Sequence, residues 1–298
     1  METAGDRLRA WQAGGTGVAL GPHRLFVHDD GIGGLPVLVI HGFPTAGFDF
    51  DLVRPLLVPD FRLIVPDLLG FGFSDKPKPH RYSIMEQADL LEALLDRIGC
   101  GPVHILAHDY GDTVAQELLA RDNARASGER RFRSVCLLNG GLFPETHRAR
   151  LIQKLLASPL GPLVNRLTDR RRFDKSFSSV FGPDTRPSFS DLAAFWALIN
   201  ENDGRHVFTS LIGYMAERRA HRDRWVGALI RAHCPVGLIN GALDPVSGAH
   251  MVARYREIVR PGDFIRMLPR IGHYPQVEAP GETARGFRDF IASLGEGS

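Results

Sequence analysis

The stretch ILAHDYGDTVAQ, residues 105–116, carries an apolar run directly into a helical pattern. Asp109 stands at the junction of the two patterns, between the small residues Ala107 and Gly111. In a tight turn between a strand and a helix, small flanking residues let the side chain at the apex stand exposed above the end of the strand. A serine is the more usual occupant of such an apex. The stretch therefore predicts a β/α unit with a carboxylate at its turn.

A repeating β/α pattern surrounds this unit. Two strands within 17–34 lie around a Gly-Pro turn, and helical patterns occupy 83–98, 113–125, 250–259 and 280–294. Strands that alternate with helices favour a mostly parallel sheet, here of eight strands, flanked by helices. The remaining strands are expected at 37–40, 61–67, 103–107, 134–138, 235–240 and 263–268.

The alternation stops after the sixth strand, and residues 142–233 look mostly helical. We interpret this segment as a helical cap that is inserted between two parts of one α/β core, residues 1–141 and 234–298. In sheets of this kind ligands bind beyond the carboxyl ends of the strands, so the cap is expected to cover a binding site there.

Three chemically suited residues follow strands in chain order: Asp109, Asp244 and His273. A nucleophile, a carboxylate and a histidine in this order form the catalytic triad of one large class of hydrolases. Each residue also has a structural interpretation. Asp109 could cap a helix, Asp244 could form the turn before Pro245, and His273 could be a buried structural histidine. Their shared position at strand ends favours catalysis.

A carboxylate nucleophile predicts a particular chemistry. It displaces a leaving group from a saturated carbon, which gives an ester on Asp109, and His273 held by Asp244 then activates the water that cleaves the ester. The backbone N–H groups of Phe43 and Tyr110 are the predicted oxyanion donors, and Gly42 would permit an unusual backbone conformation beside them. The predicted substrates are a small hydrophobic molecule, such as an epoxide or an alkyl halide, and water, with no cofactor and no metal.

These features resemble the α/β-hydrolase fold superfamily, in its Asp-nucleophile branch of epoxide hydrolases and haloalkane dehalogenases. The chain is also similar, over nearly its whole length and including the cap, to the mesoderm-specific transcript protein family. The segments that carry this second resemblance are 69–87, 108–119, 139–148, 180–188, 224–229, 243–246 and 273–278.

The resemblance suggests how the leaving group is handled. Epoxide hydrolases protonate the opening oxygen with cap tyrosines, and Tyr214 is the one tyrosine that resembles them in position. Known dehalogenases hold the halide with a Trp after the nucleophile, where this chain has Tyr110. The resemblance therefore favours an epoxide hydrolase, with Phe43, Tyr110 and the cap residue Trp196 contacting substrate. Two alternatives stay open: a haloalkane dehalogenase with an atypical halide site, in which Trp196 or Trp225 could project from the cap, and a catalytically silent protein that binds a ligand or partner.

Composition and charge limit the partners and the cell compartment that can be expected. The formal charge of +2 gives no reason to expect nucleic acid as a partner, and no run reaches the ~18 apolar residues of a membrane span. Three scattered cysteines and an N-terminus without a signal-peptide pattern favour the cytoplasm. Nothing in the sequence indicates an oligomeric state. The basic run 170–172 is interpreted as a solvated face, with attraction to an anionic substrate or lipid as the alternative.

Overall fold

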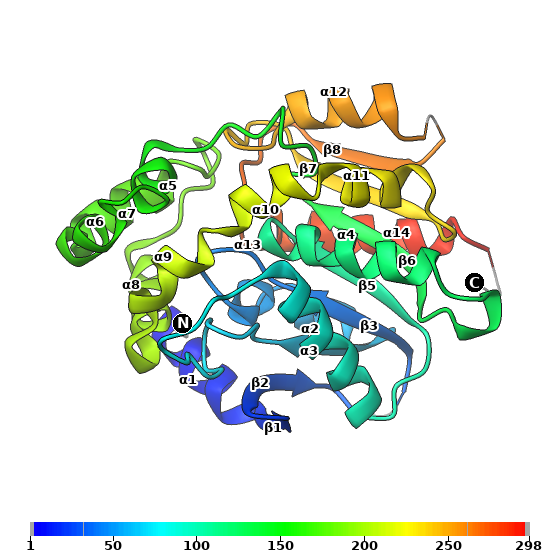
Figure 1. Cartoon of the computed structure of the whole chain (residues 1–298), viewed down its shortest axis with the longest axis horizontal. Helices are drawn as coiled ribbons and strands as arrows, with labels where there is room; N and C mark the ends of the chain where they lie inside the picture. The colour runs from blue at the N-terminus through cyan, green and yellow to red at the C-terminus, as the bar shows by residue number, and fades with distance from the viewer. Residues whose placement is uncertain (1–2, 32, 261, 296–298) are drawn as a thin grey trace.

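The computed structural model describes residues 3–31, 33–260 and 262–295, and a single sheet of eight strands runs through it (Figure 1). The strand order is β1-β2-β4-β3-β5-β6-β7-β8. Strand β2 pairs antiparallel with β1 and β4, and every other pairing is parallel. The expected eight-stranded, mostly parallel sheet is thus confirmed. Its strands are β1 (Thr16–Leu20), β2 (His23–Asp29), β3 (Leu35–Ile40), β4 (Phe61–Pro66), β5 (Val103–His108), β6 (Phe132–Leu138), β7 (Val236–Gly241) and β8 (Phe264–Leu268).

Helices connect the strands and cover both faces of the sheet. Those in the two core segments are α1 (Ala4–Gly14), α2 (Arg54–Leu57), α3 (Ile84–Arg97), α4 (Tyr110–Asn123), α12 (Ala249–Ile258), α13 (Pro275–Glu278) and α14 (Pro280–Ala292), with short 3-10 turns η1 (Gly47–Phe50) and η2 (Ser127–Glu129). Those between β6 and β7 are α5 (Leu151–Leu156), α6 (Gly161–Leu167), α7 (Arg170–Ser178), α8 (Phe189–Asn200), η3 (Glu201–Val207), α9 (Phe208–Leu211), α10 (Tyr214–Ala220) and α11 (Arg222–Ile230).

Packing on the two faces explains why the central strands are apolar throughout. Every residue of β5 and β7 is buried, as expected of parallel strands between two layers of helices. Helix α14 lies behind the sheet in Figure 1, where Phe287 contacts Phe61 of β4 with ring centroids 5.2 Å apart. Helices α3, α4 and α11 lie on the other face (Figure 1).

The helices inserted between β6 and β7 form the expected helical insertion. Its first part, α5 to α7, projects to one side of the core, whereas α11 packs against α4 (Figure 1). The indole of Trp225 on α11 donates a hydrogen bond to the buried Glu117 of α4, at 2.8 Å. The predicted limits of the cap, 142–233, therefore include a helix that contacts the core. Within the described residues, no helix combines the length and the hydropathy that crossing a bilayer requires.

Helix α1 was not expected from the sequence. Thr3 and Asp6 form a reciprocal capping box at its start, and Trp11 buries its ring against His28 and Phe48. Its N-terminus also contacts α8, because the Ala4 N–H donates to Ser190 Oγ at 3.0 Å. Helix α1 thus links the first residues of the chain to the insertion.

The turn between β5 and α4 is tighter than the sequence indicates. Helix α4 begins at Tyr110, directly after Asp109, rather than at residue 113. Asp109 takes φ 48° and ψ −103°, a conformation that costs about 1–3 kcal/mol and that surrounding structure must impose. Gly111 is required here because a Cβ atom at this position would lie 2.4 Å from the carbonyl oxygen of Ile40. Close approach of α4 to β3 therefore shapes the elbow.

Candidate active site

The structure brings Asp109, Asp244 and His273 together at the carboxyl edge of the sheet. They follow β5, β7 and β8, and each is at most 5% exposed. His273 Nδ1 and Asp244 Oδ2 are 2.8 Å apart. Because the carboxylate can only accept, Nδ1 carries the proton and Nε2 is the ring nitrogen left to act on water. The arrangement matches the order and placement predicted for a nucleophile–acid–histidine triad, with Asp109 in the place of the nucleophile.

Asp244 is held by donors that sequence reasoning missed. Asn139 Nδ2 and Ser247 Oγ each donate to Asp244 Oδ2 at 2.9 Å, and the Val246 N–H donates to Oδ1 at 2.7 Å. Asn139 follows β6 with φ 47°, a conformation that Asn tolerates better than most residues. The sequence signal was present in the Asn-Gly-Gly that ends this strand. These bonds fix the carboxylate that orients His273.

The predicted oxyanion donors flank the nucleophile. The N–H of Phe43 donates to Asp109 Oδ2 at 3.2 Å, and Tyr110 provides the first N–H of α4. Gly42 does not use the left-handed conformation that glycine permits, because its φ is not positive. Glycine is needed for space instead, since a Cβ atom there would lie 2.6 Å from His108 Nδ1.

His41 and His108 are neutral positioning groups. His41 Nε2 accepts from the Leu68 N–H at 2.9 Å, so its Nδ1 donates to the Gly42 carbonyl. His108 Nε2 donates to the backbone carbonyl of His273 at 2.8 Å. Burial lowers the pKa of His41 to about 4 and that of His108 to about 3. The hydrogen bonds of the two rings hold the loops of the site in place. Because both pKa values lie well below 7, neither ring is charged at neutral pH.

Tyr214 of α10 extends from the insertion to the residues that flank Asp109. Its ring packs against Tyr110 and Phe43, with centroids 5.1 and 6.2 Å apart. The hydroxyl is buried, and no group among the described residues meets hydrogen-bond geometry with it. Burial raises its pKa, and Asp109 adds to the rise, while Arg218 and Gln153 oppose it. Tyr214 is thus protonated at neutral pH, with the Gln153 side chain near its hydroxyl but no hydrogen bond of normal geometry among the described residues.

Arg218, one helical turn after Tyr214, was not identified from the sequence. It is 3% exposed, and its Nη2 donates to the Asp109 carbonyl at 3.0 Å and lies 3.7 Å from Asp109 Oδ1. Nε donates to Thr113 Oγ1 at 2.7 Å, and the guanidinium lies over the Tyr214 ring, 4.5 Å from its centroid. Nη1 has no partner among the described residues. The spacing of Tyr214 and Arg218 on one helix face was the available signal.

The charges of the site balance one another. Burial opposes ionisation of Asp109, but His273 and Arg218 outweigh it and lower the pKa of this carboxyl. Burial likewise opposes charge on Asp244 and His273, yet their pairing brings the pKa of Asp244 to about 2 and that of His273 to about 9. At neutral pH, two carboxylates therefore face an imidazolium and a guanidinium.

The raised pKa of His273 predicts a pH-dependent stability. Its folded pKa of about 9 lies above the unfolded value of 6.5, so the stabilisation is fully present below about pH 6.5 and is lost as pH rises through about 9. We expect wild type to lose on the order of 3 kcal/mol more unfolding free energy than His273→Gln between pH 6 and pH 10. Urea unfolding at both pH values measures this difference, and equal losses would contradict the assigned pairing.

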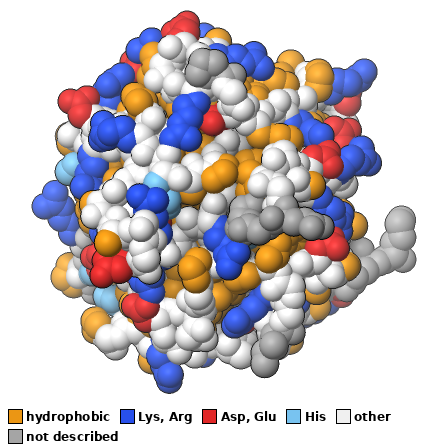
Figure 2. Space-filling view, turned by 90° about the vertical axis from the view of Figure 1, so that its right-hand side faces the viewer, with side chains coloured by type: hydrophobic (Ala, Val, Ile, Leu, Met, Phe, Trp, Pro, Cys, Tyr) orange, Lys and Arg blue, Asp and Glu red, His pale blue; other side chains and the backbone are white. Residues whose placement is uncertain are grey.

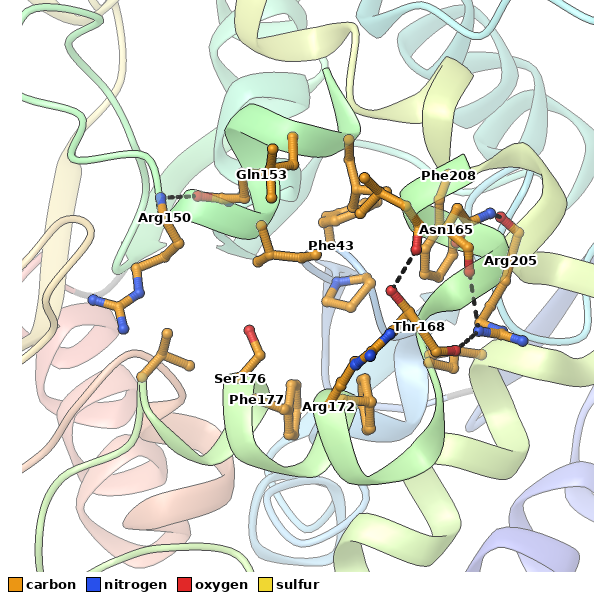
Figure 3. A pocket seen from close by; sticks show the side chains of 18 of the residues that line it. Phe43, Arg150, Gln153, Asn165, Thr168, Arg172, Ser176, Phe177, Arg205 and Phe208 are labelled. Carbon is orange, nitrogen blue, oxygen red and sulfur yellow. Dashed lines mark hydrogen bonds between the residues drawn. The ribbon is translucent and has the colours of Figure 1, made fainter. Parts of the chain in front are cut away.

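A cavity of about 390 Å³ lies beside His273, between α5, α7 and the edge of the sheet (Figure 3). Phe43, His273 and Tyr274 line it on the core side. Trp196 lines it from α8, as expected, with the Arg205 guanidinium 4.7 Å from its ring centroid. Asp109, Tyr110 and Tyr214 are not part of its wall. The cavity wall therefore gives no support to the predicted contact of Tyr110 with substrate, which stays a prediction. Aliphatic and aromatic side chains dominate the lining, which suits an apolar ligand.

A possible metal-ligand set lies outside the triad. Within the described residues, His23, His80 and Glu86 are the group of His, Cys, Asp or Glu side chains close enough to share an ion. His80 Nε2 already bonds both oxygens of Glu86 at 2.9 Å. None of the three belongs to the constellation around Asp109, so the proposed chemistry does not use them.

Comparison with known proteins identifies the fold class to which the chain belongs. Residues 36–146 match the alpha/beta hydrolase fold family. The structure is similar to the haloalkane dehalogenase DbeA from Bradyrhizobium elkani, with a TM-score of 0.77 and 22% identity over 95% of this chain and 99% of that one. Fold and triad together define an α/β-hydrolase.

Sequence relatives identify the family within this class. The chain is 43% identical to the mesoderm-specific transcript homolog protein of Bos taurus, over 96% of this chain and 88% of the relative. It is 26% identical to haloalkane dehalogenase 2 of Mycobacterium bovis, over 88% of this chain and 89% of that protein. The chain belongs to the mesoderm-specific transcript protein family, and it is related to haloalkane dehalogenases.

Proposed function

We propose that the protein hydrolyses a small hydrophobic epoxide to a diol through an ester on Asp109. One observation carries this proposal: the buried, protonated Tyr214 hydroxyl, which forms no hydrogen bond of normal geometry among the described residues, on the helix that also places Arg218 beside Asp109. Opening an epoxide creates an oxygen anion that needs a proton, and a protonated phenol next to a guanidinium supplies it.

The second candidate function is dehalogenation through the same ester. Its support is the relationship to a protein that is named a haloalkane dehalogenase. The side chains available to bind a leaving group favour an epoxide over an alkyl halide as the substrate. Trp225 already donates its indole N–H to Glu117, Phe43 has no side-chain donor, and Trp196 lies under Arg205 in the cavity wall.

In the first step, Asp109 Oδ1 attacks a ring carbon of the epoxide, and the carbon–oxygen bond of the ring breaks. Tyr214 transfers its proton to the released oxygen and becomes a phenolate. The negative charge thus moves from Asp109 to Tyr214, and Arg218 lies against both groups. The charge balance of the site is preserved during the step.

In the second step, His273 becomes a base. The negative charge of Asp109 contributes to the raised pKa of His273. The ester on Asp109 is neutral, so its formation lowers the pKa of His273. The imidazolium proton then returns to the Tyr214 phenolate. Neutral His273 then takes a proton from water as the water attacks the Asp109 carboxyl carbon. Phe43 and Tyr110 N–H groups hold the oxyanion. The tetrahedral intermediate then collapses, and its hydroxyl proton passes to the departing alcohol oxygen. This releases the diol and restores the charges of Asp109 and His273.

Tyr214→Phe separates the two candidate functions. With a panel of styrene oxide and 1-bromobutane, we expect diol formation from the epoxide and a decrease of about 10²-fold in the variant, because the proton donor is lost. Tyr255→Phe is a matched control, since the Tyr255 hydroxyl bonds Asp263 instead. Gas chromatography measures the diol, and ion chromatography measures bromide.

The other outcomes identify the alternatives. Bromide release that Tyr214→Phe leaves unchanged, with no diol from the epoxide, would establish the dehalogenase. No turnover of either substrate class, with ligand binding that survives Asp109→Asn, would establish a protein that binds without catalysis.

A further inference from the structure

The most exposed apolar side chains of the described residues all lie on the insertion. Of the large hydrophobic residues, five exceed half exposure, and the next most exposed, Leu243, reaches 48%. Soluble proteins rarely gather such residues without a partner. The five are Leu151 (72%), Leu160 (61%), Leu163 (55%), Leu167 (56%) and Phe189 (79%).

The same segment carries an excess of positive charge. Residues 150–180 contain seven basic and two acidic residues, a formal charge of +5, whereas the whole chain carries +2. Among the described residues, the exposed basic side chains of this segment form no ion pair within 4.0 Å, so their charges are free to meet an anionic partner. Figure 2 shows basic and acidic side chains interspersed on the face at the right of Figure 1, away from α5–α7. The unpaired residues are Lys154, Arg166, Arg171, Arg172 and Lys175.

These two features meet at the cavity. Leu167 and Arg172 are exposed and also line it, together with Arg150 and Leu155. In Figure 3, Gln153 of α5 and Ser176 of α7 lie across the cavity from each other, with Arg150 and Arg172 on either side. No carboxylate is part of the cavity lining among the described residues. The exposed apolar and basic side chains are therefore continuous with the wall of the cavity at Leu167 and Arg172.

We propose that helices α5, α6 and α7 dock on an anionic lipid bilayer, with the exposed leucines inserted between headgroups and the unpaired basic residues on lipid phosphates. Apolar residues flanked by lysine and arginine are typical of interfacial helices. A second copy of the chain fits the surface less well. A two-fold dimer through this surface would place two segments of charge +5 face to face. The proposal does not depend on the chemistry at Asp109.

Vesicle cosedimentation of the full chain tests the proposal. We expect binding to phosphatidylcholine vesicles that contain about 30 mol% phosphatidylglycerol, weak binding to phosphatidylcholine alone, and release by salt. The double variant Leu160→Ser/Leu163→Ser should bind at least about tenfold more weakly, because less apolar surface enters the interface. Arg166→Gln/Arg171→Gln should lose about tenfold on anionic vesicles only. The matched control Leu56→Ser/Ile230→Ser alters exposed apolar residues outside these helices and should bind as wild type does.

Three results would overturn the proposal. Wild type could fail to bind either vesicle type, or the control variant could lose as much binding as the leucine variant. Light scattering could instead show a dimer that only Leu160→Ser/Leu163→Ser dissociates, which would make this surface a self-association face. Circular dichroism of each variant verifies that its fold is intact. Because binding needs no turnover, an inactive enzyme that still binds anionic vesicles would refute the proposed function and leave this inference standing.

Discussion

Replacing Asp109 with asparagine is expected to lower epoxide turnover by about 10⁴-fold or more. The amide keeps the shape of the carboxylate, and asparagine tolerates the positive φ of the elbow better than most residues. It cannot form the alkyl ester, however, so neither step can proceed by the proposed route. Diol formation under single-turnover conditions measures the loss directly.

Two controls make the Asp109→Asn result specific. Thermal unfolding should show a folded variant, because the N–H of Phe43 retains an oxygen acceptor at position 109. Intact mass should show that the asparagine has not been hydrolysed back to aspartate. Retention of more than about a tenth of wild-type turnover in a verified variant would mean that Asp109 is not the nucleophile.

Arg218→Leu is expected to have the second largest effect, a decrease of about 10²–10³-fold in kcat/KM. The guanidinium lies 3.7 Å from Asp109 Oδ1 and over the Tyr214 ring, so it stabilises charge on the nucleophile and on the proton donor in turn. Its loss removes one of the two main charges that offset burial and leaves only His273, so the pKa of Asp109 should rise. The acid limb of the pH–rate profile should therefore move to higher pH.

The pH profile separates this role from a structural one. Arg218→Lys should recover the acid limb while losing part of the rate, because lysine keeps the charge but cannot bond both Thr113 and the Asp109 carbonyl. Arg219→Leu, on the exposed side of the same helix, is the matched control and should behave as wild type. A rate loss in Arg218→Leu with an unmoved acid limb would contradict electrostatic assistance.

Local patterns were sufficient to predict the sheet and the placement of the three candidate triad residues at one edge of it. Each triad residue follows an apolar strand, and parallel strands end at one edge, so Asp109, Asp244 and His273 had to lie near one another. The start of α4 was misjudged by three residues, because the elbow depends on the approach of Gly111 to the Ile40 carbonyl, a contact between segments 71 residues apart.

Contacts between distant segments account for what the sequence did not reveal. Arg218 acts on Asp109 from a helix 109 residues later, and an arginine on an amphipathic helix usually faces water. Asn139 reaches Asp244 across 105 residues, and only the geometry of the sheet edge brings them together. Helix α1 differs from these cases, because its Thr3–Asp6 capping box is a local signal that is present in the sequence. The helix was not predicted because its apolar pattern is short.

The ester on Asp109 is the centre of the account, and intact-mass spectrometry of His273→Gln tests it most directly. Without the base, the first step proceeds and the second stops, so incubation with an epoxide substrate should add the full mass of that epoxide to the protein. Peptide mapping should locate the added mass on Asp109. A substrate panel of epoxides and alkyl halides that leaves the variant unmodified, or an adduct on another residue, would contradict the account.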